Sequence, residues 1–557
     1  MNALSALHFP RGLGPASQDS TLATSHWCGD NERAALMSSG ILSYAPGAFW
    51  LGRDPVSALP CGIQDDRHIV TIAGSRAGKG RSGIIPNLCL YPGSVVCIDP
   101  KGENYKRTAA RRGHGTASIE GLHQQVRVLA PFNASSVPLE VRATFNPLTL
   151  IDPDADDAVE MAGLIADAIV MSGDAKDAHW DESTRGWIEA VCLLVSVHPL
   201  LAGKRDLVTV KRLIKGTLRL DPFDDRPPHE QLYESMERMG EMGGDEGNIG
   251  EVIAGAAATM REMGKDERGS VLSTVSRNLK FLDSKGIQQS LIGENDWSLD
   301  DLKTDPHGFT LYLVLPLRTM ATHARWLRMV VSLLVARMEA VDTPPATGHP
   351  VLAVLDEANV LGHMRTIEQS AGFMAGYGLK LWTVWQDLSQ LKRHYRESWE
   401  TFLGNAGTLV FFGNTDLTTL DHISKRLGQT EILQTNSNET TSRSTSRRDL
   451  SALEKIARAQ GRHAVESFLK NFTVESGSIG ETLSETHSTA RTQTKVRNPL
   501  MTADEIALWF ARETSLQIVF LAGLRPLALS RTDHDRDPQF AGMVSAIVHK
   551  QPEGSTP

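Results

Sequence analysis

The clearest chemical signature lies between residues 73 and 80, where the sequence reads AGSRAGKG directly after the apolar run HIVTIA (68–73). Small residues and a Gly-Lys pair between a buried strand and a helix are typical of a loop that holds nucleotide phosphates with backbone N–H groups. We therefore predict that Lys79 reaches the β- and γ-phosphates of ATP. The predicted phosphate-binding residues are Gly74, Ser75, Arg76, Ala77, Gly78, Lys79, Gly80 and Arg81. The alternative is a glycine-rich turn without a ligand.

This loop departs from the general G-x-x-x-x-G-K-[ST] pattern at two positions. Ala73 replaces the first glycine, and Gly80 replaces the Ser or Thr whose hydroxyl binds Mg²⁺. Ser82 is a poor substitute, because two residues along a helix rotate a side chain by about 200°. We expect Mg²⁺ to depend on another side chain and on water.

Two further apolar runs end in polar residues suited to hydrolysis. PVLAVLD (350–356) leads into Asp356 and Glu357, and LKLWTVWQ (379–386) ends at Gln386. We predict that Asp356 holds Mg²⁺, that Glu357 activates the attacking water, and that Gln386 senses the γ-phosphate or positions that water. Lys79, Glu357 and Gln386 are thus the predicted catalytic residues. The alternatives are an acidic pair that opens a helix and, at Gln386, a polar helix cap.

Seven short apolar runs supply the strands that must position these residues. They are 68–73, 94–99, 309–316, 350–356, 379–386, 407–413 and 516–523. Most are continuously apolar, as strands covered by helices on both faces tend to be, and helical patterns separate several of them. The pattern predicts an α/β fold with a mainly parallel sheet flanked by helices. Residues 156–285 contain no convincing strand, which predicts an inserted all-α domain.

Composition narrows the class of protein. The 557 residues carry 57 basic and 66 acidic side chains, and a net charge of −9 argues against coating nucleic acid through bulk charge. The first twenty residues lack the pattern of a secretory signal, and no apolar run approaches the roughly 20 residues that span a bilayer. We expect a cytoplasmic protein without a transmembrane segment.

Two stretches differ in charge from the rest of the chain. Residues 221–250 hold nine acidic and two basic residues, and this stretch either docks basic tails of substrates or is a solvated surface loop. Residues 435–495 are rich in Ser and Thr and are predicted to be partly disordered around a segment compatible with an amphipathic helix. The net charge of +4 over 443–470 suits either a phosphate backbone or a solvated helix face.

Several segments together resemble the type IV secretion coupling proteins of the TraG type. These segments are AGSRAGKGRSGIIPNLCLYPGSVVCIDPKGENY (73–105), VLDEANVLGHM (354–364), AGYGLKLWTVWQDLSQLKRHY (375–395), the stretch WETFLGNAGTLVFFGNTDLTTLDHISKRLG (399–428) and RPLALSRTDHDRDPQF (525–540). The family contains conjugative DNA-transfer ATPases, which are RecA-like P-loop motors related to the FtsK and HerA translocases. DPKGE (99–103) is more specific to it than the phosphate loop.

The resemblance implies an ATP- and Mg²⁺-dependent ring, most simply a hexamer, with an all-α domain at one face. Its partners would be other copies of the chain, single- or double-stranded DNA with a relaxase, or secreted protein substrates, and components of a type IV secretion channel. Arg426 is one candidate for an arginine supplied to a neighbouring subunit; Arg318 and Arg365 compete with it, and a solvated base is the alternative. Since many members begin with transmembrane helices, either a separate membrane protein anchors this chain at the inner membrane or it works as a soluble motor.

Two other functions stay open. One is an FtsK- or HerA-type DNA pump unrelated to secretion, and the other is a nucleotide-gated substrate adaptor with negligible turnover. The predicted division of the chain is an N-terminal extension (1–60), a nucleotide-binding domain in three parts (61–155, 286–434 and 496–557), the all-α insert (156–285) and the Ser/Thr-rich insert (435–495).

Overall fold

The computed structural model describes residues 25–132, 137–170, 178–241, 247–293, 295–437, 444–445 and 491–545. The predicted amphipathic segment and basic cluster within 435–495 therefore lie outside the described residues, apart from Ser444 and Thr445, which form a short strand.

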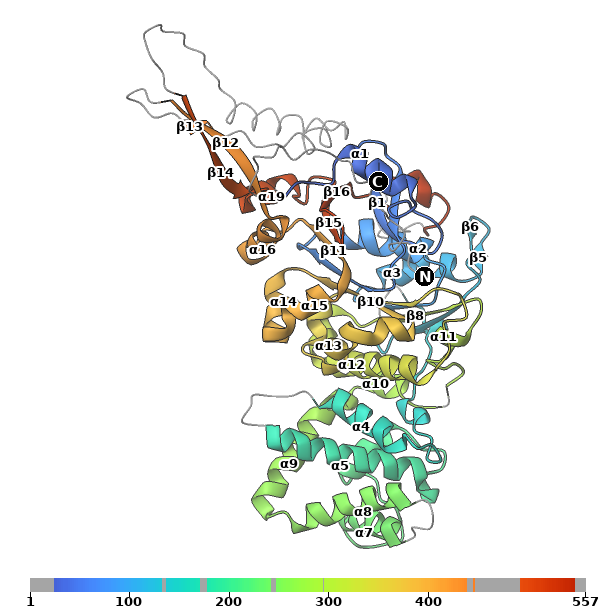
Figure 1. Ribbon diagram of the computed structural model, residues 1–557. Coiled ribbons are helices and arrows are strands. Elements are labelled where there is room, and N and C mark those ends of the chain that lie inside the picture. Colours follow the sequence, from blue (N-terminus) through green and yellow to red (C-terminus); the bar gives the residue numbers. More distant parts are fainter. Residues whose placement is uncertain are drawn as a thin grey trace, which may run out of the picture.

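An eleven-stranded sheet runs through the centre of the molecule (Figure 1). Its spatial order is β2-β1-β16-β15-β11-β3-β10-β9-β4-β8-β7. The strands are β1 Phe49–Arg53, β2 Pro60–Ile63, β3 His68–Ala73, β4 Val95–Ile98, β7 Gln125–Leu129, β8 Phe309–Leu313, β9 Val351–Leu355, β10 Leu379–Trp385, β11 Ala406–Phe412, β15 Leu516–Leu521 and β16 Leu527–Ser530. From β11 to β7 all neighbours are parallel, whereas β15, β16, β1 and β2 pair antiparallel. The predicted α/β class with a mainly parallel sheet is confirmed.

All seven apolar runs form strands, and the sheet also contains strands that the sequence did not reveal. The strands β1 (FWLGR) and β2 (PCGI) contain glycine or proline, which weakened their strand signal. They pair with each other, and β1 pairs with β16 through Arg53 and Ser530. Residues 49–63 thus continue the sheet across the predicted boundary at residue 60, and the domain boundaries themselves stay a prediction.

Both faces of the sheet are buried, as the continuous apolar runs require. Along β9, Val351, Ala353 and Leu355 enter one hydrophobic core, whereas Leu352 and Val354 enter the other. This alternation is the two-residue period of a strand. Helices from different parts of the chain cover each face.

The smaller core lies under the helices that follow β3 and β4, and the larger core lies under the helices that follow β8 to β11. The first group is α2 Ile85–Leu90 and α3 Glu103–Arg112, with α1 Asp30–Ser38 nearby. The second group is α12 Leu317–Ala340, α13 Arg365–Phe373, α14 Leu388–Tyr395, α15 Trp399–Gly404 and α16 Leu417–Leu427. The helix α19 Ala503–Trp509, which precedes β15, covers the same core. A short helix, α11 Asp301–Thr304, precedes β8.

A helical region forms the lower end of the molecule in Figure 1, below α12. Its helices are α4 Ala158–Ile169, α5 Ala178–Val197, α6 Leu207–Ile214, α7 Pro228–Glu241, α8 Gly247–Glu262, α9 Lys265–Asn278 and α10 Lys285–Ser290. The described residues between 156 and 285 include no strand, as predicted. The acidic stretch 221–250 contains α7 and the start of α8, and these two helices pack against each other.

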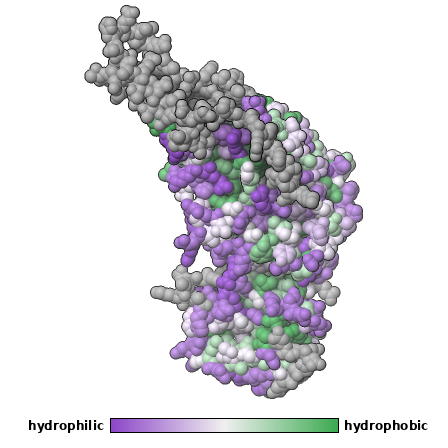
Figure 2. All heavy atoms as spheres, viewed as in Figure 1, coloured by the Kyte–Doolittle hydropathy of each residue, from purple (hydrophilic) through white to green (hydrophobic). Residues whose placement is uncertain are grey.

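Two small sheets lie outside the main sheet. Strands β12 Gln429–Ser437 and β14 Arg491–Pro499 pair antiparallel, with β13 Ser444–Thr445 at one edge, and they project from the upper end of the body in Figure 1. β5 Gly115–Thr116 and β6 Ile119–Glu120 form a short hairpin. Figure 2 shows mainly hydrophilic side chains on one face of the body, with hydrophobic patches over the helical region. None of the helices in the described part of the chain has the length and apolarity to cross a membrane.

Candidate functional site

The predicted site residues follow strands that end at one edge of the sheet. β3 leads into the phosphate loop (residues 74–81), and its neighbour β10 ends before Gln386, with Ile72 opposite Trp385. The next strand, β9, ends before Asp356 and Glu357. Because carboxyl ends of adjacent parallel strands meet at the same edge, the fold itself brings these side chains together.

The phosphate loop packs tightly against the end of β11. A Cβ atom added at Gly74 would lie 1.9 Å from the carbonyl oxygen of Gly413, so this position has no room for a side chain. Arg76 adopts the left-handed conformation at φ +57°, and Gly78 has φ +93°. Among the described residues, the backbone N–H groups of Ser75, Arg76 and Gly78 donate no hydrogen bond within the protein. Such a run of free donors before a helix fits a bound phosphate.

The helix after the loop begins with an unusual turn. Residues Gly80–Ile84 form a π-helical turn, which continues as α2. The hydroxyl of Ser82 is buried and donates to the carbonyl oxygen of Gly78 at 3.0 Å. This engagement agrees with the expectation that Ser82 does not replace the hydroxyl missing at Gly80.

Lys79, Asp356, Glu357 and Gln386 form one connected group, which we call the Lys79 cluster. Lys79 Nζ lies 3.0 Å from Glu357 Oε1 and 3.6 Å from Asp356 Oδ1. Gln386 Nε2 donates to the other carboxylate oxygen of Glu357, Oε2, at 3.0 Å. Both oxygens of Glu357 are therefore fixed by the two side chains that the sequence assigned to the same chemistry.

The backbone and the electrostatics of this edge are unusual. Glu357 has φ +61°, a left-handed conformation that is uncommon for residues other than glycine and that recurs at functional sites. Burial raises the pKa of Asp356 above its usual range, and the Lys79 ammonium partly opposes that shift. A cation is thus held against two carboxylates in a partly buried site.

The C-terminal segment contacts the phosphate loop from the outside, which no local sequence signal indicated. Arg531 Nη1 donates to the carbonyl oxygen of Ala77 at 2.5 Å, and the guanidinium lies over the ring of Phe412. The side chain of Arg81 pairs with Asp535, with Nη2 2.6 Å from Oδ2. The guanidinium of Arg81, a predicted phosphate-binding residue, is therefore engaged by Asp535.

Asp99 is a second residue to which the sequence assigned no role, although DPKGE marked its position. It directly follows β4, the strand next to β9, and its carboxylate accepts hydrogen bonds from the backbone N–H groups of Glu103 and Tyr105. It is almost fully buried, and burial raises the pKa of Asp99 to about 6. The neighbouring charge of Asp356 acts in the same direction.

Arg426, the candidate arginine for a neighbouring subunit, lies in the last turn of α16. Its guanidinium carbon is 5.2 Å from the centre of the Phe520 ring in its own chain. Among the described residues it makes no contact with the Lys79 cluster. A role in a neighbour's site stays a prediction.

Comparisons with known proteins agree with these features. The model of the family described as "Type IV secretory system Conjugative DNA transfer" matches residues 24–459. A conjugal transfer protein TraG of Escherichia coli is 28% identical over 385 residues, which cover 66% of this chain and 56% of that protein. Protein VirD4 of Rhizobium radiobacter is 25% identical over 402 residues, which cover 72% of this chain and 52% of that protein. The chain thus spans about half the length of the curated relatives that it matches.

Solved structures show the same fold at low identity. The plasmid coupling protein TrwB in complex with the non-hydrolysable ATP analogue ADPNP has a TM-score of 0.57 at 14% identity, over 94% of this chain and 97% of that one. The structure of TrwB with ADP and Mg²⁺ has a TM-score of 0.53, also at 14% identity, over 93% and 97% of the two chains. Because the family model matches most of the chain, the chain belongs to the type IV secretory system conjugative DNA transfer family.

Proposed function

We propose that the chain is an ATP-hydrolysing coupling protein that recruits a DNA–relaxase complex or protein substrates to a type IV secretion channel. The observation that carries the hydrolytic part is the contact of Glu357 with both Lys79 and Gln386 beside a loop of free backbone N–H groups. The coupling part rests on membership of the conjugative DNA transfer family. This membership favours a role in secretion over a DNA pump unrelated to it.

In this proposal each residue of the Lys79 cluster has one task. The N–H groups of Ser75, Arg76 and Gly78 and the Lys79 ammonium would bind the phosphates and offset the negative charge that develops during transfer. Glu357 would accept a proton from the attacking water. Gln386, which already donates to Glu357, would hold that water or the γ-phosphate in line.

The residues present also fit a divalent cation. Asp356 is a largely buried carboxylate whose only ion-pair partner among the described residues, Lys79, lies at 3.6 Å, so a divalent cation held by Asp356 would offset the cost of its burial. Mg²⁺ bound there would neutralise phosphate charge. Since Gly80 supplies no hydroxyl, Asp356 and water would be its ligands on the protein side.

Assembly and membrane attachment are the least direct parts of the proposal. A ring, most simply a hexamer, would place an arginine such as Arg426 at a neighbour's site. The relatives named TraG and VirD4 are longer than the region they share with this chain. The ring would work either against the channel at the inner membrane or as a soluble motor.

The decisive experiment is ATP hydrolysis with and without single- or double-stranded DNA, for the intact chain and for Lys79→Ala and Glu357→Gln. DNA-stimulated turnover that both substitutions abolish is the expected result. Gly80, where Ser or Thr is usual, favours one competing function, a nucleotide-gated adaptor. Nucleotide binding without turnover over a wide range of protein concentration would establish the adaptor instead.

A further inference from the structure

One turn of α12 carries two arginines that reach in different directions. Arg325 and Arg328 are three residues apart on this helix, and neither pairs with a carboxylate among the described residues. Both donate to backbone or amide oxygens at the ends of other elements. An unpaired guanidinium is costly to bury, so each of these contacts must be well formed to be retained.

Arg328 holds the segment that directly follows Glu357. Its side chain is buried, with 7% of the residue exposed, and its Nη1 atom donates to the carbonyl oxygens of Leu361 at 2.8 Å and His363 at 2.6 Å. Glu357 directly precedes the 3₁₀ turn Ala358–Leu361; Leu361 ends this turn, and His363 lies two residues beyond it. Charge-assisted bonds of this length are among the stronger hydrogen bonds in proteins.

The backbone conformation at Glu357 depends on stabilising contacts of this kind. A left-handed conformation at a residue other than glycine costs on the order of 1 kcal/mol and persists only where its surroundings fix it. The carbonyl oxygen of Glu357 accepts from the N–H of Val360 at 2.9 Å, so the conformation of Glu357 is tied to the 3₁₀ turn that Arg328 clamps. Release of the clamp would free the turn and, with it, the direction of the Glu357 side chain.

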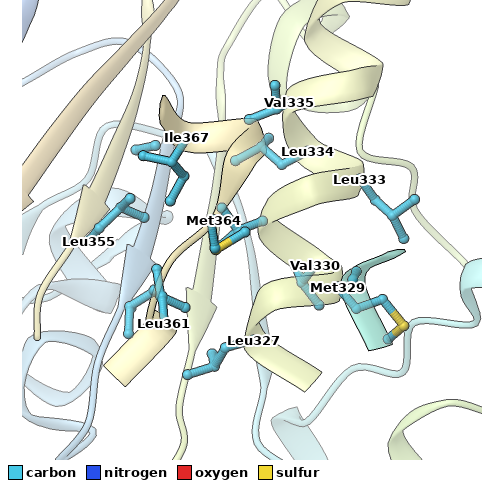
Figure 3. Close-up of a cluster of buried hydrophobic side chains, with 14 of the residues drawn as sticks. Leu327, Met329, Val330, Leu333, Leu334, Val335, Leu355, Leu361, Met364 and Ile367 are labelled. Carbon is cyan, nitrogen blue, oxygen red and sulfur yellow. The ribbon is translucent and has the colours of Figure 1, made fainter. Parts of the chain in front are cut away.

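Hydrophobic contacts place α12 where this clamp can act. Figure 3 shows Leu327, Val330 and Leu334 of α12 facing Leu361, Met364 and Ile367 from the segment after Glu357. All of these side chains are buried in the larger core. A well-packed seam transmits a displacement rather than absorbing it, since protein interiors are close to crystal density.

Arg325 connects the same turn of α12 to the helical region. Its Nε atom donates to the carbonyl oxygen of Ile169, the last residue of α4, at 3.0 Å, and its Nη2 atom donates to Asn278 Oδ1 at the end of α9, also at 3.0 Å. The helical region and the turn beside Glu357 are thus bound to one helical turn.

We propose that Arg328 is a positioning residue for Glu357, and that Arg325 makes this positioning depend on the helical region. A ligand that shifts α4 or α9 would then alter hydrolysis without contacting nucleotide. The catalytic half of this inference rests on the proposed ATPase. The structural half, that Arg328 and Arg325 stabilise the backbone of residues 357–363, does not depend on ATP hydrolysis.

The test combines turnover with amide hydrogen exchange on the full chain. Arg328→Ala is expected to lower kcat about 10- to 100-fold, as small misplacements of catalytic groups do, while KM for ATP stays within about twofold. Exchange over residues 357–363 should rise at least about tenfold. Arg328→Lys, which keeps a cation able to donate to the same carbonyls, should recover most of both.

Arg337→Ala is the matched control, because it removes an arginine from the same helix and breaks an ion pair with Asp300 far from the turn. It should change neither kcat nor exchange over 357–363. Unchanged exchange in Arg328→Ala would overturn the proposal, as would a loss in the control of equal size. Arg325→Ala should raise exchange both at 165–170 and at 357–363, and a rise at 165–170 alone would overturn the link to the helical region. A wild-type chain without turnover would count against the ATPase only, since exchange still reports the clamp.

Discussion

Lys79 and Glu357 form an ion pair across the edge of the sheet, with 3.0 Å between Nζ and Oε1. The two side chains come from adjacent parts of the sheet edge but are 278 positions apart in the sequence. A phosphate that takes the Lys79 ammonium must compete with this carboxylate. Nucleotide binding and the freeing of Glu357 are therefore linked events.

That link predicts opposite effects of one substitution on affinity and on turnover. Glu357→Gln removes the competing charge, so it should bind ATP at least as tightly as the wild type while hydrolysing it at least about 100-fold more slowly. Affinity for a fluorescent ATP analogue and steady-state turnover measure the two. Glu397→Gln, at an exposed position, should change neither. Weaker binding by Glu357→Gln would contradict the competition.

Gln386 should matter for turnover more than for affinity. Its amide nitrogen lies 3.0 Å from Glu357 Oε2. Gln386→Ala therefore leaves the phosphate loop intact but removes a hydrogen bond that orients the Glu357 carboxylate. We expect kcat to fall about tenfold or more, with little change in nucleotide affinity. Gln386→Glu should be worse, because it brings two like charges together. Gln125→Ala, at an exposed position on β7, is the control.

Two glycines of the phosphate loop should respond in opposite ways. Gly74→Ala would drive a methyl group to 1.9 Å from the carbonyl oxygen of Gly413, so the loop must move and nucleotide affinity should drop at least about tenfold. At Gly80 no atom beyond its chain neighbours and its own helix backbone lies within 4 Å of an added Cβ. Gly80→Ala should therefore be tolerated, and Gly80→Thr should lower the Mg²⁺ concentration needed for half-maximal turnover. Equal affinities of Gly74→Ala and Gly80→Ala would refute the packing argument.

Asp99 should make stability depend on pH. Its folded pKa, about 6, lies above the value of about 3.9 in an unfolded chain, so its contribution to stability is present below pH 4 and is lost as pH rises through 6. Between pH 5 and pH 8 this one group should cost the wild type roughly 1.5 kcal/mol of unfolding free energy. Asp99→Asn should lack that loss in urea titrations at the two pH values. Parallel pH dependence in the two proteins would show that Asp99 titrates normally.

Arg112 should be among the most sensitive positions for stability. Its guanidinium is fully buried and donates to the carbonyl oxygens of Leu88, Tyr91 and Gly93 and to the side chains of Gln124 and Thr310. Arg112→Ala removes these hydrogen bonds from the buried interior at a cost of about 3–5 kcal/mol, although Gly93 and Gln124 still accept from Gln124 and Thr310, respectively. Urea denaturation measures it, and Arg393→Ala on the exposed face of α14 should stay within about 0.5 kcal/mol of the wild type.

The parallel part of the sheet was predictable because its strands are recognisable in the sequence. Continuous apolar runs such as those at β3, β9 and β10 need cover on both faces, and the polar residues that end them must then meet at one edge. The grouping of Lys79, Asp356, Glu357 and Gln386 follows from that rule alone. Their distances do not, since they depend on the left-handed backbone at Glu357.

The antiparallel extension of the sheet was not predicted, because its strands have a weak signal in the sequence. β1 and β2 are short and contain glycine or proline, and β1 gains its burial from α2 and from β16, which lies in a distant part of the chain. The contact of Arg531 with Ala77 joins residues 454 positions apart, and no spacing in the sequence encodes it. The role of Arg328 was not predicted for the same reason, because an arginine in a helix gives no sign in the sequence of the carbonyl groups that it will contact.

The return of the C-terminal segment to the phosphate loop has a consequence for biosynthesis. At the usual 5–20 residues per second, a ribosome needs roughly 20 to 90 s to make the 454 residues between Ala77 and Arg531. The loop therefore leaves the ribosome long before the arginine that braces it exists. A nascent chain would therefore carry an incomplete nucleotide site for most of its synthesis. Interrupted translation would yield truncated products whose phosphate loop lacks the contact with Arg531.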